Sequence, residues 1–69
     1  MTVHTDHGPH TLPAGSTVAD LLERLAAQAP HLAGCATAVN GDFVPRHQRA
    51  AHLLQHGDTL LCFAPITGG

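Results

Sequence analysis

One amphipathic stretch, STVADLLERLAAQA at residues 16–29, limits most strongly what this chain can fold into. Its apolar residues recur at i, i+3, i+4 and i+7, which places them on one face of a helix: Val18, Leu21, Leu22 and Leu25. Thr17 can cap this helix, Asp20 supplies a carboxylate to its first turn, and Pro30 ends it. A chain of 69 residues forms one small domain. The sequence therefore predicts a single helix packed on a small sheet.

Segments with strand character lie on both sides of this helix. Turn-forming residues separate them, with DHGP at 6–9, Asn-Gly at 40–41 and QHGD at 55–58. HQRAAHLL at 47–54 favours a short helical turn. We expect strands at 1–5, 10–12, 35–39, 43–45 and 59–64. The order of two strands, helix, two strands, short turn and last strand predicts an α+β fold, a mixed sheet with the helix on one face.

The last predicted strand, TLLCFA, is apolar on both faces. Alternation places Leu61 and Phe63 on one face, and Leu60, Cys62 and Ala64 on the other. A helix on only one side of the sheet leaves the second face uncovered. Two interpretations fit this pattern: ordinary apolar groups at a protein surface, or a docking face for a partner.

Composition and charge exclude several classes of protein. The net charge is −2, there is no Lys, and the only permanent cations are Arg24, Arg46 and Arg49, so no basic stripe for nucleic acid is present. No apolar run approaches the roughly 20 residues of a membrane span, and the first residues, MTVHTDHG, lack the features of a signal peptide. We therefore expect a cytoplasmic protein.

The two cysteines and seven histidines favour structural rather than catalytic roles. Cys35 and Cys62 show no CxxC spacing, so we expect buried free thiols without a disulfide. The histidines lack the spacing of metal ligands, and we expect no metal site and solvated side chains. No Ser/His/Asp set, phosphate-binding glycine loop or carboxylate pair is present, so the sequence shows none of these catalytic arrangements.

The sequence ends APITGG, and Gly68 and Gly69 contribute nothing to a core. A frayed end explains such a pair. The alternative is a functional end, because glycine permits a close backbone approach that any β-carbon would obstruct.

Four segments together resemble the ThiS family, the small sulfur carrier proteins of thiamin biosynthesis. They are PAGSTVADLLERL at 13–25, VNGDFVPR at 39–46, HGDTLLCF at 56–63 and the final ITGG. Each motif alone is common, but their order, spacing and distance from the C-terminus are specific. The resemblance covers nearly the whole chain. It implies a β-grasp, ubiquitin-like fold, in agreement with the element order above.

The resemblance also implies a function. The C-terminal carboxylate of Gly69 would be adenylated by an E1-like adenylyltransferase that uses ATP and magnesium. Gly68, which has no side chain, would precede the reactive residue. Sulfur from a persulfide donor of the cysteine desulfurase type would then give a thiocarboxylate, which thiazole synthase would consume. The carrier itself would bind no cofactor and would be no enzyme.

The resemblance further implies which residues meet these partners. We expect partner contacts at Phe43, Arg46, Leu61 and Phe63, and at Pro65, Ile66 and Thr67 along the entry path of the tail. We expect a β-grasp domain at 1–64 and a flexible tail at 65–69.

Three alternative functions stay open at this point. The first is the small subunit of molybdopterin synthase, which also carries sulfur on a C-terminal Gly-Gly. The second is a β-grasp binding module without carrier activity, and the third is a His-based metal chaperone.

Overall fold

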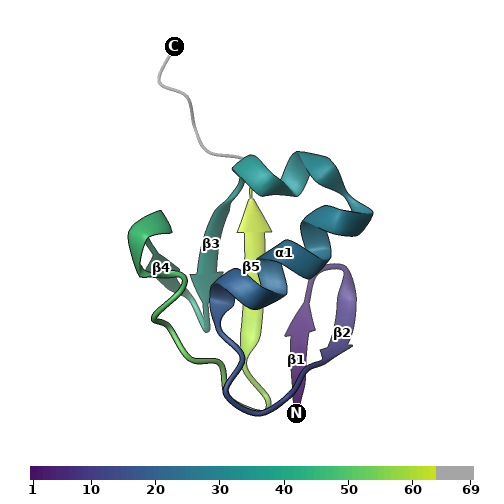
Figure 1. Ribbon diagram of the computed structural model, residues 1–69, viewed down its shortest axis with the longest axis vertical. Helices are drawn as coiled ribbons and strands as arrows, with labels where there is room; N and C mark the ends of the chain where they lie inside the picture. The colour runs from purple at the N-terminus through teal and green to yellow at the C-terminus, as the bar shows by residue number, and fades with distance from the viewer. Residues whose placement is uncertain (64–69) are drawn as a thin grey trace.

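The computed structural model describes residues 1–63, which form two hairpins, one α-helix and a last strand (Figure 1). The strands are β1 (Thr2–Thr5), β2 (Gly8–Thr11), β3 (Ala36–Val39), β4 (Asp42–Val44) and β5 (Thr59–Phe63). The helix is α1 (Val18–Gln28), and two 3-10 helices are η1 (Pro30–Gly34) and η2 (Arg46–Gln48). This order of elements confirms the predicted α+β class.

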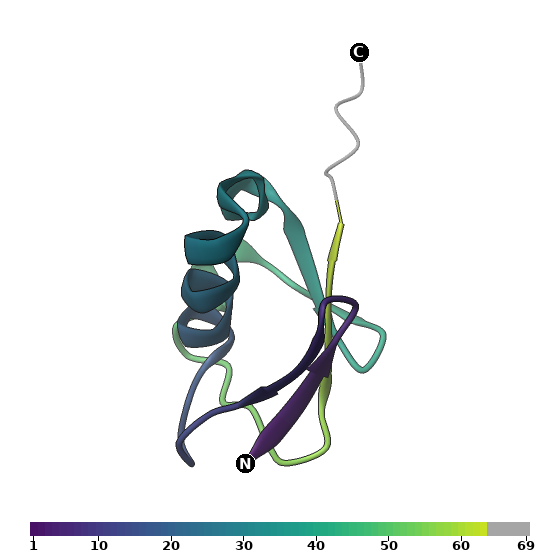
Figure 2. The same ribbon diagram turned by 90° about the vertical axis from the view of Figure 1, so that its right-hand side faces the viewer.

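The five strands form one mixed sheet in the order β2-β1-β5-β3-β4. β1 and β5 are parallel neighbours at its centre, and the other pairs are antiparallel. Figure 2 shows the sheet edge-on, with α1 and η1 on one side only. This is the β-grasp arrangement, in which one helix crosses a sheet whose first and last strands pair. No helix within residues 1–63 is long and apolar enough to cross a membrane.

The core lies between α1 and the sheet. The four residues of the predicted apolar helix face are all buried. They pack against inward-facing side chains of the strands and loops: Val3, Leu12, Leu32, Val39, Val44, Leu54 and Leu60. Large aliphatic groups thus fill the space between the helix and the sheet. The apolar face that the helical spacing of the sequence predicts packs there on the apolar face of the strands.

The start of α1 is fixed by its cap and by the loop that follows η2. The Thr17 hydroxyl accepts a hydrogen bond from the backbone N–H of Asp20, whose carboxylate accepts from the Thr17 N–H. The first two N–H groups of the helix donate to the carbonyl groups of His52 and Arg49, at 3.0 and 3.1 Å. The free donors of a helix end are therefore satisfied, and residues 49–52 are held against the first turn.

Several element boundaries differ from the sequence prediction for local reasons. The second strand runs from Gly8 to Thr11, rather than over 10–12, because Asp6 and His7 alone make the turn and Gly8, at φ +101°, already belongs to the strand. The third strand begins at residue 36 rather than 35, because the Cys35 N–H closes η1 by donating to the Leu32 carbonyl.

Two further differences involve 3-10 helices. η1 was not expected, since five residues are too few to show a helical period. The fourth strand covers 42–44 instead of 43–45, and Pro45 caps η2. The helical turn expected over 47–54 is confined to η2 and the turn that follows it, and Leu53 instead forms an isolated bridge with Thr17.

Candidate functional site

Three of the predicted partner contacts share one face of the sheet. Strand register pairs Ala38 with both Leu61 and Phe43, and Ala36 with Phe63, and directly paired residues point to the same face. This face is opposite α1, because the alternate residues of β5 are buried beneath the helix. Leu61 and Phe63 therefore point outward, as the alternation predicted.

These three residues, Phe43, Leu61 and Phe63, are called the outer patch below. Their exposures are 63%, 42% and 47%, high values for large apolar side chains. Ala38 lies between Phe43 and Leu61 and is only 7% exposed, although it faces away from the core. The two larger side chains therefore cover it and make the patch continuous. Figure 2 shows no helix on this side of the sheet, and such an uncovered apolar face has the character of a docking surface.

Arg46 does not belong to the outer patch. It is exposed and lines a groove beside α1, together with Leu22 and Ala26. Arg46 is separated from the outer patch because it lies beyond the end of β4, after Pro45. The alternation of side chains along the strand therefore does not determine on which face of the sheet Arg46 lies. The predicted contact set is thus divided between the two layers of the fold.

The remaining predicted site residues lie outside the described residues. They are Pro65, Ile66, Thr67, Gly68 and Gly69, which follow the end of β5 at Phe63. The predicted domain boundary between residues 64 and 65 also falls there. The reactive role of Gly69 and the entry-path role of its neighbours stay predictions.

Two of the turn motifs that carried the resemblance are connected to each other. Asn40 and Gly41 both have positive φ, 52° and 88°, as the tight hairpin turn requires. The Asn40 side-chain amide donates to Asp58 Oδ1, and its carbonyl oxygen accepts from the Thr59 N–H, both at 3.0 Å. The second carboxylate oxygen of Asp58 accepts from the Gln55 N–H at 2.8 Å. The role of these motifs is to set the β3–β4 turn against the start of β5.

The cysteines are buried and unbridged, as predicted. Cys62 lies on β5, while Cys35 precedes β3. Burial raises the pKa of the Cys62 thiol from 9.0 to about 12, and contact with the Cys35 thiol and the charge of Asp6 add to the effect. A thiol held this firmly in its protonated form is a poor nucleophile, so Cys62 is part of the core.

The histidines are dispersed over the surface. Five are exposed, while His10 and His52 are partly buried. Within residues 1–63, no group of three or more His, Cys, Asp or Glu side chains is arranged to hold a metal ion. His56 has a structural role, since its Nδ1 accepts from the Thr2 N–H at 3.0 Å.

Sequence reasoning missed one residue, Arg49. It is 8% exposed, and its side chain donates to Thr37 Oγ1 and to the Cys35 carbonyl oxygen. The one signal in the sequence was an arginine among alanines and leucines, in RAAHLL, with no acidic residue nearby. That pattern does not distinguish a buried cation from an exposed one.

Comparison with known proteins decides the family. The family model described as ThiS family matches residues 7–69. The chain belongs to the ThiS family. A curated ThiS protein, the sulfur carrier protein ThiS of Escherichia coli (strain K12), is 48% identical over 56 residues, covering 81% of this chain and 80% of that protein. A solved ThiS structure, the thiamine biosynthesis protein from Geobacter metallireducens, has a TM-score of 0.79 at 21% identity and covers 100% of both chains.

These findings confirm the ThiS resemblance and the β-grasp fold inferred from sequence. The match to the family model extends through the C-terminal Gly-Gly. At 21% identity the Geobacter structure supports the fold alone, whereas the Escherichia coli relative is close enough to support the family.

Proposed function

We propose that this protein is a sulfur carrier of thiamin biosynthesis whose C-terminal carboxylate is its working group. The observation that carries the proposal is the ThiS family match, which spans residues 7–69 and so includes the terminal Gly-Gly. The curated relative that is 48% identical is itself a sulfur carrier protein. The outer patch supports the proposal, because a carrier must dock on the enzymes that modify it.

The proposed chemistry begins with activation. A carboxylate is a poor electrophile, so an E1-like adenylyltransferase joins the Gly69 carboxylate to AMP from ATP, with magnesium, and releases pyrophosphate. The acyl carbon is then open to attack by the terminal sulfur of a persulfide, which displaces AMP. Cleavage of the sulfur–sulfur bond by a thiol leaves a thiocarboxylate on Gly69. Thiazole synthase takes this sulfur, and the carrier takes part as a co-substrate.

The proposed role of the fold is presentation. The tail must enter the active site of another protein, and two terminal glycines offer the least obstruction there. The outer patch ends at Phe63, the last residue of β5, directly before the segment that contains the tail. A partner that covers Leu61 and Phe63 is therefore already next to the root of that segment.

Mass spectrometry tests the proposal directly. The protein is incubated with ATP, magnesium, a cognate activating enzyme and a persulfide donor, and the modification is then located by fragmentation. We expect replacement of one oxygen by sulfur at Gly69, and only when ATP is present. Localisation is essential because oxidation of Met1 changes the mass by nearly the same amount.

A variant without Gly69 is the matched control. It keeps residues 1–63 intact and should accept no sulfur. An unmodified carboxylate in the full chain, with several activating enzymes tested, would contradict the carrier function and favour a binding module.

A further inference from the structure

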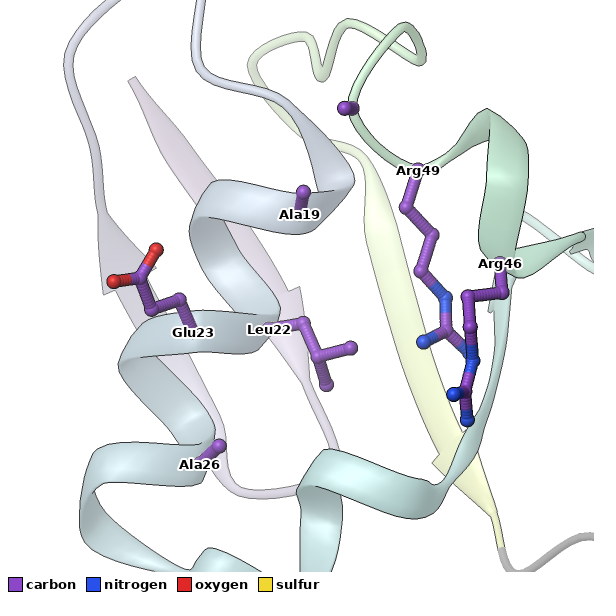
Figure 3. A pocket seen from close by; sticks show the side chains of 7 residues that line it. Ala19, Leu22, Glu23, Ala26, Arg46 and Arg49 are labelled. Atoms are coloured by element: carbon purple, nitrogen blue, oxygen red, sulfur yellow. The ribbon is translucent and has the colours of Figure 1, made fainter.

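A groove on the helix side of the molecule is not used by the proposed sulfur transfer. It lies between α1 and the η2 segment and has a volume of about 410 Å³ (Figure 3). Its apolar lining comes from Ala19, Leu22 and Ala26 of the helix and from Ala50. Arg46 and Arg49 line the opposite side. We call it the two-arginine groove.

Arg49 is a buried cation that has no anionic partner among residues 1–63. Its Nε donates to Thr37 Oγ1 at 3.2 Å and its Nη2 to the Cys35 carbonyl oxygen at 2.7 Å, and both acceptors are neutral. No carboxylate of residues 1–63 lies within ion-pair distance of it. Within residues 1–63 no hydrogen bond uses Nη1, and no buried side-chain nitrogen or oxygen of this part of the chain lacks a partner, so Nη1 is not fully shielded from solvent.

The positive charge of the molecule is concentrated at this groove. Two of its three permanent cations line it, and the chain has no Lys. In Figure 3 the side chains of Arg46 and Arg49 run in the same direction, and Leu22 points toward them from the helix. Glu23 also borders the groove, but its carboxylate points away from both guanidinium groups. A protein of net charge −2 therefore presents one local site that attracts anions.

Hydrogen bonds fix the wall of the groove that the η2 segment forms. The Arg49 carbonyl accepts from the second N–H of α1, and the Arg49 side chain is bonded across to the Thr37 hydroxyl of β3. These contacts connect the η2 segment to both layers. A site fixed in this way loses little conformational freedom on binding. An anion that enters it also compensates the buried charge of Arg49 for the hydration that burial removes.

We propose that the two-arginine groove binds a carboxylate group of a partner polypeptide, with a neighbouring apolar side chain seated on Leu22 and the alanines. A planar carboxylate suits the fork of a guanidinium group. The apolar lining favours a carboxylate with an aliphatic neighbour over a bare phosphate, which needs polar groups around it. The inference does not rest on sulfur transfer. The groove and the outer patch lie on opposite layers, so two partners can be bound at once.

Nuclear magnetic resonance titration tests the inference with a defined probe. The full-length protein is titrated with the blocked dipeptide acetyl-Leu-Glu-amide and, separately, with its uncharged isostere acetyl-Leu-Gln-amide. We expect saturable shifts at the Arg49 Nε–H and at the amides of Ala19, Leu22 and Ala26 with the Glu dipeptide. The Gln dipeptide should bind at least tenfold more weakly. Equal binding of the two dipeptides, or no saturable shift with either, would overturn the proposal.

Variants of the exposed arginines provide matched controls. Arg46→Gln and Arg24→Gln each remove one positive charge, but only Arg46 lines the groove. We expect Arg46→Gln to weaken binding of the Glu dipeptide about tenfold and Arg24→Gln to leave it within twofold. Equal effects would show a nonspecific charge response and reject the site. Arg49→Met should abolish binding if it folds; because Arg49 is buried, the decision rests on Arg46.

Inorganic phosphate separates the two possible anion sources. Phosphate should bind more weakly than the Glu dipeptide, because it has no apolar part for Leu22. Binding of phosphate that is equal or tighter would identify a simple anion site and contradict a polypeptide carboxylate.

Discussion

At the scale of single residues, the least expected feature is the polar connection through the core between Thr37 and Arg49. Thr37 is fully buried, and its hydroxyl donates to the Val44 carbonyl at 3.1 Å while it accepts from Arg49 Nε. A small domain buries few side chains, so each polar group among them must be satisfied. The hydroxyl of Thr37 meets this requirement for itself and for the guanidinium group.

Replacing Thr37 by valine tests this connection. Valine has nearly the same shape but leaves Arg49 Nε without its acceptor, so the free energy of unfolding should fall by about 1–3 kcal/mol. Urea denaturation measures the change. Thr11→Val is the control, because Thr11 is exposed on the edge strand β2, and surface substitutions of this kind stay within about 0.5 kcal/mol. Equal effects of the two substitutions would contradict the role assigned to the hydroxyl.

The Cys62 thiol provides a second prediction at this scale. The chain has no Lys and no Tyr, so cysteines are the only side chains that titrate in the alkaline range below arginine. In the folded protein the pKa of Cys62 is raised from 9.0 to about 12. Between these values the unfolded chain releases a proton that the folded chain keeps. The free energy of unfolding should therefore fall as the pH rises from about 9 to about 12.

Thiolate absorbance measures this titration without interference from tyrosine. In a Cys35→Ala variant only Cys62 absorbs, and burial, the largest cause of the shift, remains. Its midpoint in the folded protein should lie well above the value in urea. Coincident midpoints would show that Cys62 is accessible to water.

At the scale of elements, the β3–β4 turn and the start of β5 form one unit through Asn40 and Asp58. This unit explains why VNGD and HGDT occur together in the sequence. Asparagine suits the positive φ of the first turn position, and its amide supplies both a donor to Asp58 and an acceptor to the Thr59 N–H. One side chain thus sets the position of two strands.

Asn40→Asp should destabilise the protein in a pH-dependent manner. The variant keeps the acceptor for Thr59 and tolerates the same backbone, but it places a second carboxylate 3.0 Å from that of Asp58. We expect a loss of about 1 kcal/mol at neutral pH, where both groups are charged. The loss should shrink below about pH 4, where carboxyl groups take up protons. Urea denaturation at the two pH values measures it.

Exchanging the two side chains is the control for this prediction. The double variant Asn40→Asp/Asp58→Asn again pairs one carboxylate with one amide, and it should regain part of the lost stability. A loss in Asn40→Asp that is independent of pH would point to altered hydrogen bonding in place of charge repulsion.

Most elements could be predicted from the sequence because local chemistry determines them. The spacing of Val18, Leu21, Leu22 and Leu25 was sufficient for α1, and Asn40-Gly41 was sufficient for the second hairpin. The five residues of η1 show too little period to be recognised, and the helical turn predicted over 47–54 was found only in η2 and the turn that follows it. The second strand was displaced because a glycine can serve as a turn residue or as the first strand residue, and tertiary pairing makes the choice.

The candidate site was predictable only where strand alternation applies. The alternation of side chains along β5 predicts that Leu61 and Phe63 point to the same face of the sheet, and the register of the strands places Phe43 on that face as well. Arg46 lies beyond Pro45, outside any strand, so its side of the molecule depends on how η2 packs on α1. The burial of Arg49 depends on the same long-range contact. Gly68 and Gly69 rest on the family resemblance, since they lie outside the described residues.

At the scale of the whole molecule, the two layers present different surfaces. The sheet exposes the outer patch, which is apolar, whereas the helix side carries the two-arginine groove. A carrier that binds several enzymes needs surfaces that its partners can distinguish. An apolar surface selects partners by burial of apolar area, whereas a charged groove selects them by complementary charge.

Phe43→Asp tests the docking role of the outer patch. Phe43 is 63% exposed, so its replacement should change the unfolding free energy by less than about 1 kcal/mol. The KM of the activating enzyme for the carrier should rise at least tenfold, which pyrophosphate release measures. Leu53→Asp is the matched control: Leu53 is 60% exposed but lies beside the start of α1. Similar KM values for the two variants would contradict docking on the outer patch.

The parallel pairing of β1 with β5 has a consequence for synthesis on the ribosome. The first strand and the last described strand are neighbours at the centre of the sheet, so the core cannot close until β5 has left the exit tunnel. A truncated chain that ends before Thr59 lacks β5, the central strand, so its helix cannot bury its apolar face against a complete sheet and we expect it to be open to proteases. Stability of the whole domain therefore depends on a strand that is synthesised last among the described elements, and we expect only chains that include β5 to fold.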